Sequence, residues 1–184
     1  LLRRYERLVA DADGTLPGAF RPVSAWLHAH APAETGASIV HGDFRIGNVM
    51  VAREAPARIL AVLDWELATL GDPLMDVGYL LACYAVPGEP PHAVADLGRA
   101  TLEPGYPTRA ELAAQYAAAS GRDVSQLGWF TVLSLYKLAA MYEYSRRRGE
   151  DDYYRDPALV ARYLDLAHAA LGDTHPPITE APPT

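Results

Sequence analysis

Five polar residues lie close together in the sequence, around two short apolar stretches. His41, Asp43, Arg45 and Asn48 belong to the segment HGDFRIGN, and Asp64 belongs to the segment VLDWE. An amide oxygen from Asn48 and a carboxylate from Asp64 are hard ligands that suit Mg²⁺. Asp43 would then remain free as a base. This combination suits phosphoryl transfer, in which one aspartate orients or deprotonates an acceptor hydroxyl while the metal binds nucleotide phosphates.

Short apolar runs on either side of these residues predict the elements that position them. The stretch SIVHGDF indicates a strand that runs into a loop, and its glycine, with that of IGN, permits tight turns there. The runs NVMVA and ARILAVLDW predict the two strands of a β-hairpin. This hairpin would bring Asp64 back beside Asn48. We therefore define a catalytic loop over residues 39–50 and a metal segment over residues 59–66.

Helical patterns surround the hairpin on both sides. Apolar residues recur at helical spacing from Leu2 to Val9, and a second short helix is predicted near residues 23–27. After the hairpin, helices are predicted over residues 73–86, 108–120, 123–148 and 156–171, with Asp72 as the cap of the first and a capping box in the second. The predicted fold class is mostly α with a small β-hairpin, an α+β arrangement.

Composition limits the possible classes of function. The chain has 184 residues and a net charge of −7, which argues against a general nucleic-acid binder because such a protein needs a basic face. A single cysteine, Cys83, excludes an intrachain disulfide and a cysteine zinc cluster, so a cytoplasmic location is expected. No apolar run approaches the ~18 residues of a membrane span. One domain over residues 1–172, with a helical subdomain at 73–171, and a disordered Pro-rich tail over 173–184 are predicted.

Three segments together resemble one known family. HGDFRIGN resembles the H-G-D-x-x-x-x-N catalytic loop of the aminoglycoside phosphotransferase and choline kinase superfamily, whose fold is protein-kinase-like. VLDWE resembles its metal-binding segment, and LATLGDPLMDVGYLL resembles the helical segment that follows. The resemblance is strongest to the phosphotransferases related to the kinase-like domain of some acyl-CoA dehydrogenases. It covers residues 39–82 well and the remaining helices weakly.

The resemblance implies a role for each polar residue. Asp43 would be the catalytic base, and Asn48 with Asp64 would hold Mg²⁺ on the phosphates of ATP. Without the pattern, Asp43 would be a turn residue and Asn48 a turn cap. His41 would shape the loop rather than take part in the chemistry.

Two further residues have roles that the resemblance leaves less defined. Asp76 would be a buried acceptor for the backbone donors of the catalytic loop, although at its helical position it could merely favour the helix dipole. Arg45 is either a solvated loop residue or a phosphate contact. The substrate-binding residues are unknown at this stage.

The resemblance also implies parts that the sequence does not contain. Kinase-like folds bind ATP between two lobes, and the N-terminal lobe supplies a phosphate-covering loop and a strand lysine. Here Lys137 is the only lysine and follows the motifs, and no Gly-rich turn precedes them. We therefore expect a C-terminal catalytic lobe without its N-terminal lobe, inactive alone. The apolar surface that a missing lobe or a partner would cover is expected at Val49, Val51, Ile59 and Leu60.

Three functions are consistent with these residues. The first is an ATP- and Mg²⁺-dependent O-phosphotransferase acting on a small hydroxylated acceptor. The second is a non-catalytic remnant that binds a metal or a small ligand, and the weaker third is a metal-dependent phosphohydrolase using His41, Asp43 and Asp64. Acidic and aromatic residues between positions 87 and 165 could receive a cationic acceptor by cation–π contact. Alternatively, they form a solvated acidic surface with core tyrosines.

Overall fold

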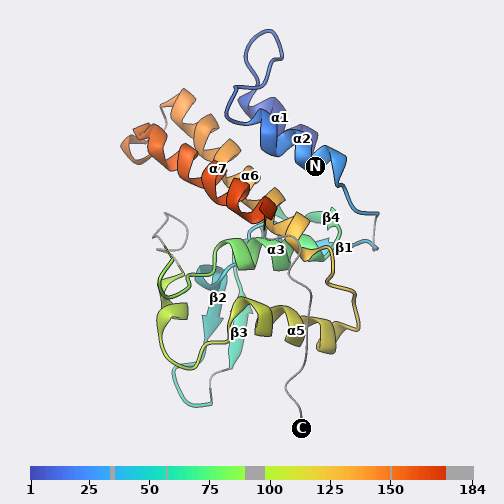
Figure 1. Cartoon of the computed structure of the whole chain (residues 1–184). Coiled ribbons are helices and arrows are strands. Elements are labelled where there is room, and N and C mark those ends of the chain that lie inside the picture. The colour runs from blue at the N-terminus through green and yellow to red at the C-terminus, as the bar shows by residue number, and fades with distance from the viewer. Residues whose placement is uncertain (34–35, 57, 90–97, 150, 173–184) are drawn as a thin grey trace.

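Helices make up most of the fold, and two small antiparallel sheets lie between them (Figure 1). A computed structural model describes residues 1–33, 36–56, 58–89, 98–149 and 151–172, so the predicted tail at 173–184 lies outside the described residues. The helices are α1 (Leu2–Val9), α2 (Arg21–Ala29), α3 (Leu74–Ala82), α5 (Arg109–Ser120), α6 (Leu127–Arg148) and α7 (Pro157–Gly172). This arrangement confirms the predicted mostly helical α+β class.

One of the two sheets is the predicted hairpin. Strand β2 (Val49–Val51) pairs with β3 (Ile59–Val62), and Val49 lies opposite Val62. The other sheet joins β1 (Ser38–Val40) to β4 (Thr69–Gly71). The sequence indicated β1 but not its partner, because three residues paired across thirty positions leave no local pattern. Together the two sheets bracket the catalytic loop and the metal segment.

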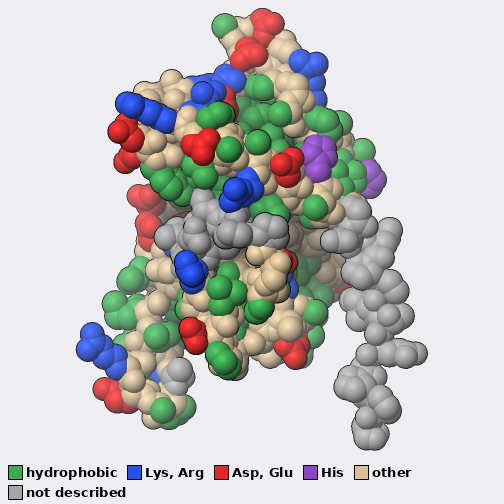
Figure 2. Space-filling view, turned by 60° about the vertical axis from the view of Figure 1, so that its left-hand side comes forward, with side chains coloured by type: hydrophobic (Ala, Val, Ile, Leu, Met, Phe, Trp, Pro, Cys, Tyr) green, Lys and Arg blue, Asp and Glu red, His purple; other side chains and the backbone are tan. Residues whose placement is uncertain are grey.

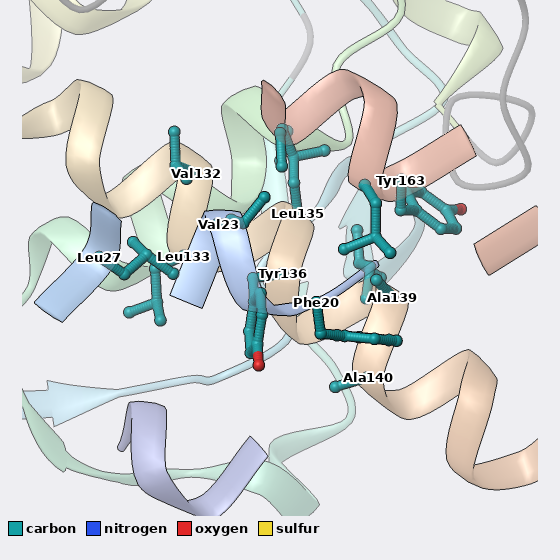
Figure 3. Close-up of a cluster of buried hydrophobic side chains, with 14 of the residues drawn as sticks. Phe20, Val23, Leu27, Val132, Leu133, Leu135, Tyr136, Ala139, Ala140 and Tyr163 are labelled. Atoms are coloured by element: carbon teal, nitrogen blue, oxygen red, sulfur yellow. The ribbon is translucent and has the colours of Figure 1, made fainter. Parts of the chain in front are cut away.

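The long helix α6 is the centre of the hydrophobic core. Its apolar side chains pack against α1, α2, α3 and α7. Figure 3 shows the part of this core that α6 forms with α2 and α7. Tyr136 of α6 and Leu27 of α2 are completely buried, and the ring of Phe20 meets that of Tyr136 edge to face at 5.6 Å. Because α6 is apolar around most of its circumference, it serves as the rigid support for the elements that carry the site.

Helix α3 crosses α6 at very close range. A Cβ atom added at Gly78 would lie 2.7 Å from the carbonyl carbon of Phe130, so only glycine fits at this crossing. Leu74, Val77 and Leu81 of α3 form a second buried cluster with residues of α6 and α5. This packing fixes α3 beneath the catalytic loop.

The two sheets leave apolar side chains exposed. Val51, Ile59 and Leu60 on the hairpin are 54%, 64% and 53% exposed, while Val49 is half-buried. The β1–β4 sheet adds exposed Ile39 and Leu70. Hydrophobic side chains accordingly reach the surface among the charged ones in Figure 2. Three of the four predicted apolar positions are therefore exposed, and the second sheet carries two further exposed apolar residues.

No helix among the described residues is both long enough and apolar enough to cross a lipid bilayer.

Candidate functional site

Asp43 and Asn48 are joined by two hydrogen bonds. The side-chain amide nitrogen of Asn48 donates to the Asp43 carboxylate and to the Asp43 carbonyl, each at 2.8 Å. A short 3₁₀ turn over Ile46–Asn48 closes the loop and places Asn48, which is 6% exposed, at the start of β2. Since the amide nitrogen faces Asp43, the amide oxygen is the Asn48 atom that remains to bind a cation.

Asp64 lies at the end of β3, next to the start of β2. The amide of Leu63 donates to the carbonyl of Asn48 at 2.8 Å, which places the two predicted metal ligands at the same end of the hairpin. Asp64 is exposed and adopts φ 67° and ψ 58°, the one left-handed conformation of a non-glycine residue within the described ranges. Such strained backbone persists where surrounding structure enforces it and is concentrated at functional sites.

Asp76 holds the catalytic loop from below. Its two carboxylate oxygens accept hydrogen bonds from the backbone amides of His41 at 2.7 Å and of Gly42 at 2.9 Å. Asp76 lies in the first turn of α3 and is half-buried rather than fully buried. Both contacts are charge-assisted, and they fix two successive peptide groups of the loop.

Gly42 brings the loop into direct contact with the metal segment. Its φ is +82°, and a Cβ atom there would lie 2.6 Å from the carbonyl oxygen of Leu67. A side chain at this position would therefore force the two functional segments apart.

His41 links the catalytic loop to the metal segment. The His41 side chain is buried, at 2% exposed. Its Nδ1 atom accepts a hydrogen bond from the Asp43 amide at 3.2 Å, so the ring proton is on Nε2, which donates to the Leu63 carbonyl at 2.7 Å. It also packs against Trp65 with the ring centres 4.7 Å apart. Because both ring nitrogens are used in this way, His41 has no nitrogen to offer a metal.

Arg45 lies over the catalytic loop and contacts the predicted base. Its Nε atom is 3.5 Å from a carboxylate oxygen of Asp43, and both side chains are largely shielded from water. Its guanidinium also covers Gly47, where a Cβ atom would lie 2.3 Å from Arg45 Nη1. Arg45 is thus an ion-pair partner of Asp43 in this structure.

Sequence reasoning missed two residues of the site, Lys137 and Tyr79. Lys137, 7% exposed in the middle of α6, donates from Nζ to the carbonyl of Gly42 and lies 4.1 Å from the ring centre of Tyr79. Burial lowers the pKa of Lys137, while the charges of Asp43 and Asp76 oppose that shift. Burial raises the pKa of the Tyr79 hydroxyl, and the nearby charge of Asp43 adds to the effect. Its status as the only lysine was the one signal that could have marked Lys137.

Two of the acidic and aromatic residues considered for a cationic acceptor, Tyr142 and Glu143, make their contacts within the fold. The Tyr142 ring meets Tyr154 and Tyr163 edge to face at 5.2 and 5.1 Å, which leaves no room for a cation between them. Glu143 accepts hydrogen bonds from Arg146 and Arg147. These contacts favour the interpretation of core tyrosines and internal ion pairs over a cationic acceptor site.

The oxygen atoms of the site suit a metal held jointly with a phosphate ligand. Within the described part of the chain, no three His, Cys, Asp or Glu side chains are grouped closely enough to hold a metal ion. Asn48 and Asp64 instead offer one amide oxygen and one carboxylate. Mg²⁺ is commonly bound in this way, by one or two protein ligands with phosphates and water.

The sequence matches a model of the phosphotransferase enzyme family over residues 1–114. It is 33% identical to acyl-CoA dehydrogenase family member 11 of Rattus norvegicus over 181 residues, which is 95% of this chain and 23% of that protein. The human protein of the same name is 33% identical over 168 residues, or 88% of this chain and 21% of that protein. The similarity is to the kinase-like region of these proteins, so the chain spans about a fifth of their length.

A solved structure shares the fold. It belongs to a protein from Ralstonia eutropha JMP134 that is named as an aminoglycoside phosphotransferase, with a TM-score of 0.67 and 25% sequence identity. The likeness covers 91% of this chain and 54% of that protein.

Proposed function

Because this chain belongs to the phosphotransferase enzyme family, we propose that it is the catalytic lobe of an ATP- and Mg²⁺-dependent O-phosphotransferase that acts on a hydroxyl group of a small acceptor. Asp43 is the base that orients or deprotonates this hydroxyl. The single observation that carries the proposal is the pair of hydrogen bonds from Asn48 to Asp43, each 2.8 Å, which fixes the base beside a metal ligand. Phosphoryl transfer depends mainly on such positioning.

The residues of the chain divide the remaining work. Asn48 and Asp64 hold Mg²⁺, which when bound neutralises the phosphate charge that develops during transfer. Asp76 and His41 keep the loop in place from α3 and from the metal segment respectively. Arg45 leaves Asp43 to contact an incoming phosphate, because a phosphate offers a guanidinium a stronger, bidentate partner than a carboxylate at 3.5 Å.

The exposed apolar strands support a second part of the proposal. We infer that β2, β3 and the β1–β4 sheet pack against another lobe or a partner protein that covers the nucleotide phosphates. Exposed Ile39, Ile59 and Leu70 form part of this surface, and large apolar side chains left exposed on strands support an interaction site. On this proposal the 184 residues alone bind a metal–nucleotide but transfer phosphate at background rate.

The proposal is tested by measuring phosphate transfer from ATP to a panel of hydroxylated acceptors, with Asp43→Asn as the test variant. Asp72→Asn is the matched control, because Asp72 is a carboxylate that accepts a hydrogen bond from the Leu74 amide at the start of α3. Transfer that depends on Asp43 and not on Asp72 supports the assignment of the base, and robust transfer by this chain alone would contradict the need for a second lobe. Transfer above background, by this chain alone or with a second lobe supplied, that is unchanged in Asp43→Asn would refute the assignment.

The two other functions are less well supported. A metal-dependent phosphohydrolase would need a ligand from His41, whose two ring nitrogens already bond to backbone groups. A non-catalytic remnant would bind metal–nucleotide in the same way and show no transfer once a second lobe is supplied.

A further inference from the structure

Four polar backbone groups at or just before Asp43 each have a specific hydrogen-bond partner. They are the amides of residues 41, 42 and 43 and the carbonyl of Gly42. The amides of His41 and Gly42 donate to Asp76, and the amide of Asp43 donates to the His41 ring. The remaining group is the carbonyl of Gly42, which accepts from Lys137. This carbonyl belongs to the peptide bond between Gly42 and Asp43, so its hydrogen bond directly sets the plane from which the Asp43 side chain departs.

Lys137 also contacts a tyrosine close to the base. Its ammonium group lies 4.1 Å from the ring centre of Tyr79, at a distance typical of a cation–π contact. Burial raises the pKa of the hydroxyl of this tyrosine, and the charge of Asp43 is near enough to add to the effect. A single side chain of α6 therefore holds the backbone that precedes the base and packs on a tyrosine in its vicinity.

Stability does not explain a lysine at this position. Burying an ammonium group is costly, and apolar side chains of similar volume are often as stable or more stable at such sites. The neighbours of Lys137 in α6 are apolar, and all fifteen other Lys or Arg residues of the chain are arginines. A compact ammonium with freely rotating donors can reach a carbonyl from within a packed helix, whereas a planar guanidinium is bulkier.

We propose that Lys137 is a positioning residue for Asp43, which sets the orientation of the base through the Gly42 carbonyl. The inference rests on the proposed function, since it is Asp43 as a base that requires a fixed orientation. It assigns a positioning role in the site to a residue that lies ninety-five positions from Gly42 in the sequence.

Nuclear magnetic resonance of the whole 184-residue chain tests the proposal without requiring turnover. In Lys137→Met the resonance of the Asp43 amide nitrogen should shift, because this nitrogen belongs to the Gly42–Asp43 peptide group, whose carbonyl loses its hydrogen bond. Lys137→Arg keeps the charge and should return this resonance partly to its original position. Ser134→Ala is the matched control. Ser134 lies one turn before Lys137 on α6 and lines the same cavity as Lys137, but its hydroxyl donates to the carbonyl of Phe130.

The proposal is supported if the Asp43 amide resonance shifts several times more in Lys137→Met than in Ser134→Ala while the amide resonances of α7 stay in place. An Asp43 resonance that moves no more than in the control, or equal shifts throughout the helices, would overturn it. Any phosphate transfer that depends on Asp43 should fall by roughly 100-fold in Lys137→Met with KM for ATP unchanged, as expected for a displacement of about 1 Å.

A labelling experiment on the unsubstituted chain covers the case in which Lys137→Met does not fold. Lysine labelled at Nζ gives one signal, because Lys137 is the only lysine. This signal should shift in Asp43→Asn and stay in place in Asp72→Asn, and the opposite pattern would contradict the proposal. Failure of the proposed function would appear separately, as an absence of phosphate transfer once a second lobe is supplied, with these resonance shifts intact.

Discussion

Replacing Asp76 by alanine should destabilise the fold through the catalytic loop alone. The substitution removes the acceptors of two backbone hydrogen bonds, from His41 at 2.7 Å and from Gly42 at 2.9 Å. Both amides belong to a loop that packs directly against Leu67, so neither can move far to find another partner. The loss in the free energy of unfolding is therefore expected to arise at the catalytic loop and to be large.

The contacts set the magnitude. A hydrogen bond to a charged group contributes about 1.5–3 kcal/mol, and Asp76 is only half-buried, so the lower value applies to each bond. Asp76→Ala should then lower the free energy of unfolding by about 3 kcal/mol. For a chain of this length the corresponding fall in Tm is roughly 6–12 °C. Asp76→Asn keeps one acceptor oxygen and should lose about half as much.

Urea unfolding followed by circular dichroism measures these differences. Asp165→Ala is the control, because Asp165 is an exposed acidic residue of α7 and its removal should change stability by less than about 0.5 kcal/mol. If Asp76→Ala costs less than about 1 kcal/mol, or no more than Asp165→Ala, then Asp76 does not support the loop.

Three further perturbations follow from the packing and the charges. Gly78→Ala should destabilise by about 1–3 kcal/mol in urea unfolding, because its methyl group would overlap the Phe130 backbone, and an unchanged midpoint would contradict the close α3–α6 crossing. Burial raises the pKa of Glu143, but hydrogen bonds from Arg146 and Arg147 outweigh it and lower the pKa overall. The resulting stabilisation is present above the unfolded pKa of about 4.3 and is lost as pH falls through the folded pKa. Glu143→Gln should therefore be less stable than the unsubstituted chain at neutral pH and should lose less additional stability in acid. If both chains lose the same stability in acid, this interpretation is wrong. Burial, with the charge of Asp43 nearby, raises the pKa of the Cys83 thiol to about 12. A thiol reagent should therefore modify Cys83 after unfolding and not before. Rapid labelling of the native chain would show that the surroundings of Cys83 are open to solvent.

The local features of the site could be predicted from the sequence. The hairpin, the loop with its two glycines and the helix that carries Asp76 each have a short-range signal in turn residues, alternating apolar residues or a cap. These signals place Asn48 and Asp64 at the same end of the hairpin. The exposed apolar positions also followed, since strands with apolar side chains on both faces need a partner on each face.

The long-range features could not be predicted in this way. Strand β4 pairs with β1 through only three residues, and propensity over so short a run carries little information. Lys137 reaches Gly42 because α6 crosses beneath α3, which depends on the close contact at Gly78 rather than on any motif. The tyrosines near Tyr142 resembled a cation site by composition, yet their rings pack against one another.

Paramagnetic relaxation by Mn²⁺ in the presence of ATP tests the central claim most directly, because it locates the metal without requiring turnover. The account predicts that amide signals of residues 43–48 and 64–65 broaden while those of α7 do not. It also predicts that Asn48→Ala combined with Asp64→Ala abolishes the effect. Broadening elsewhere in the chain, or broadening at the loop that persists in the double variant, would contradict a metal–nucleotide site built from Asn48 and Asp64.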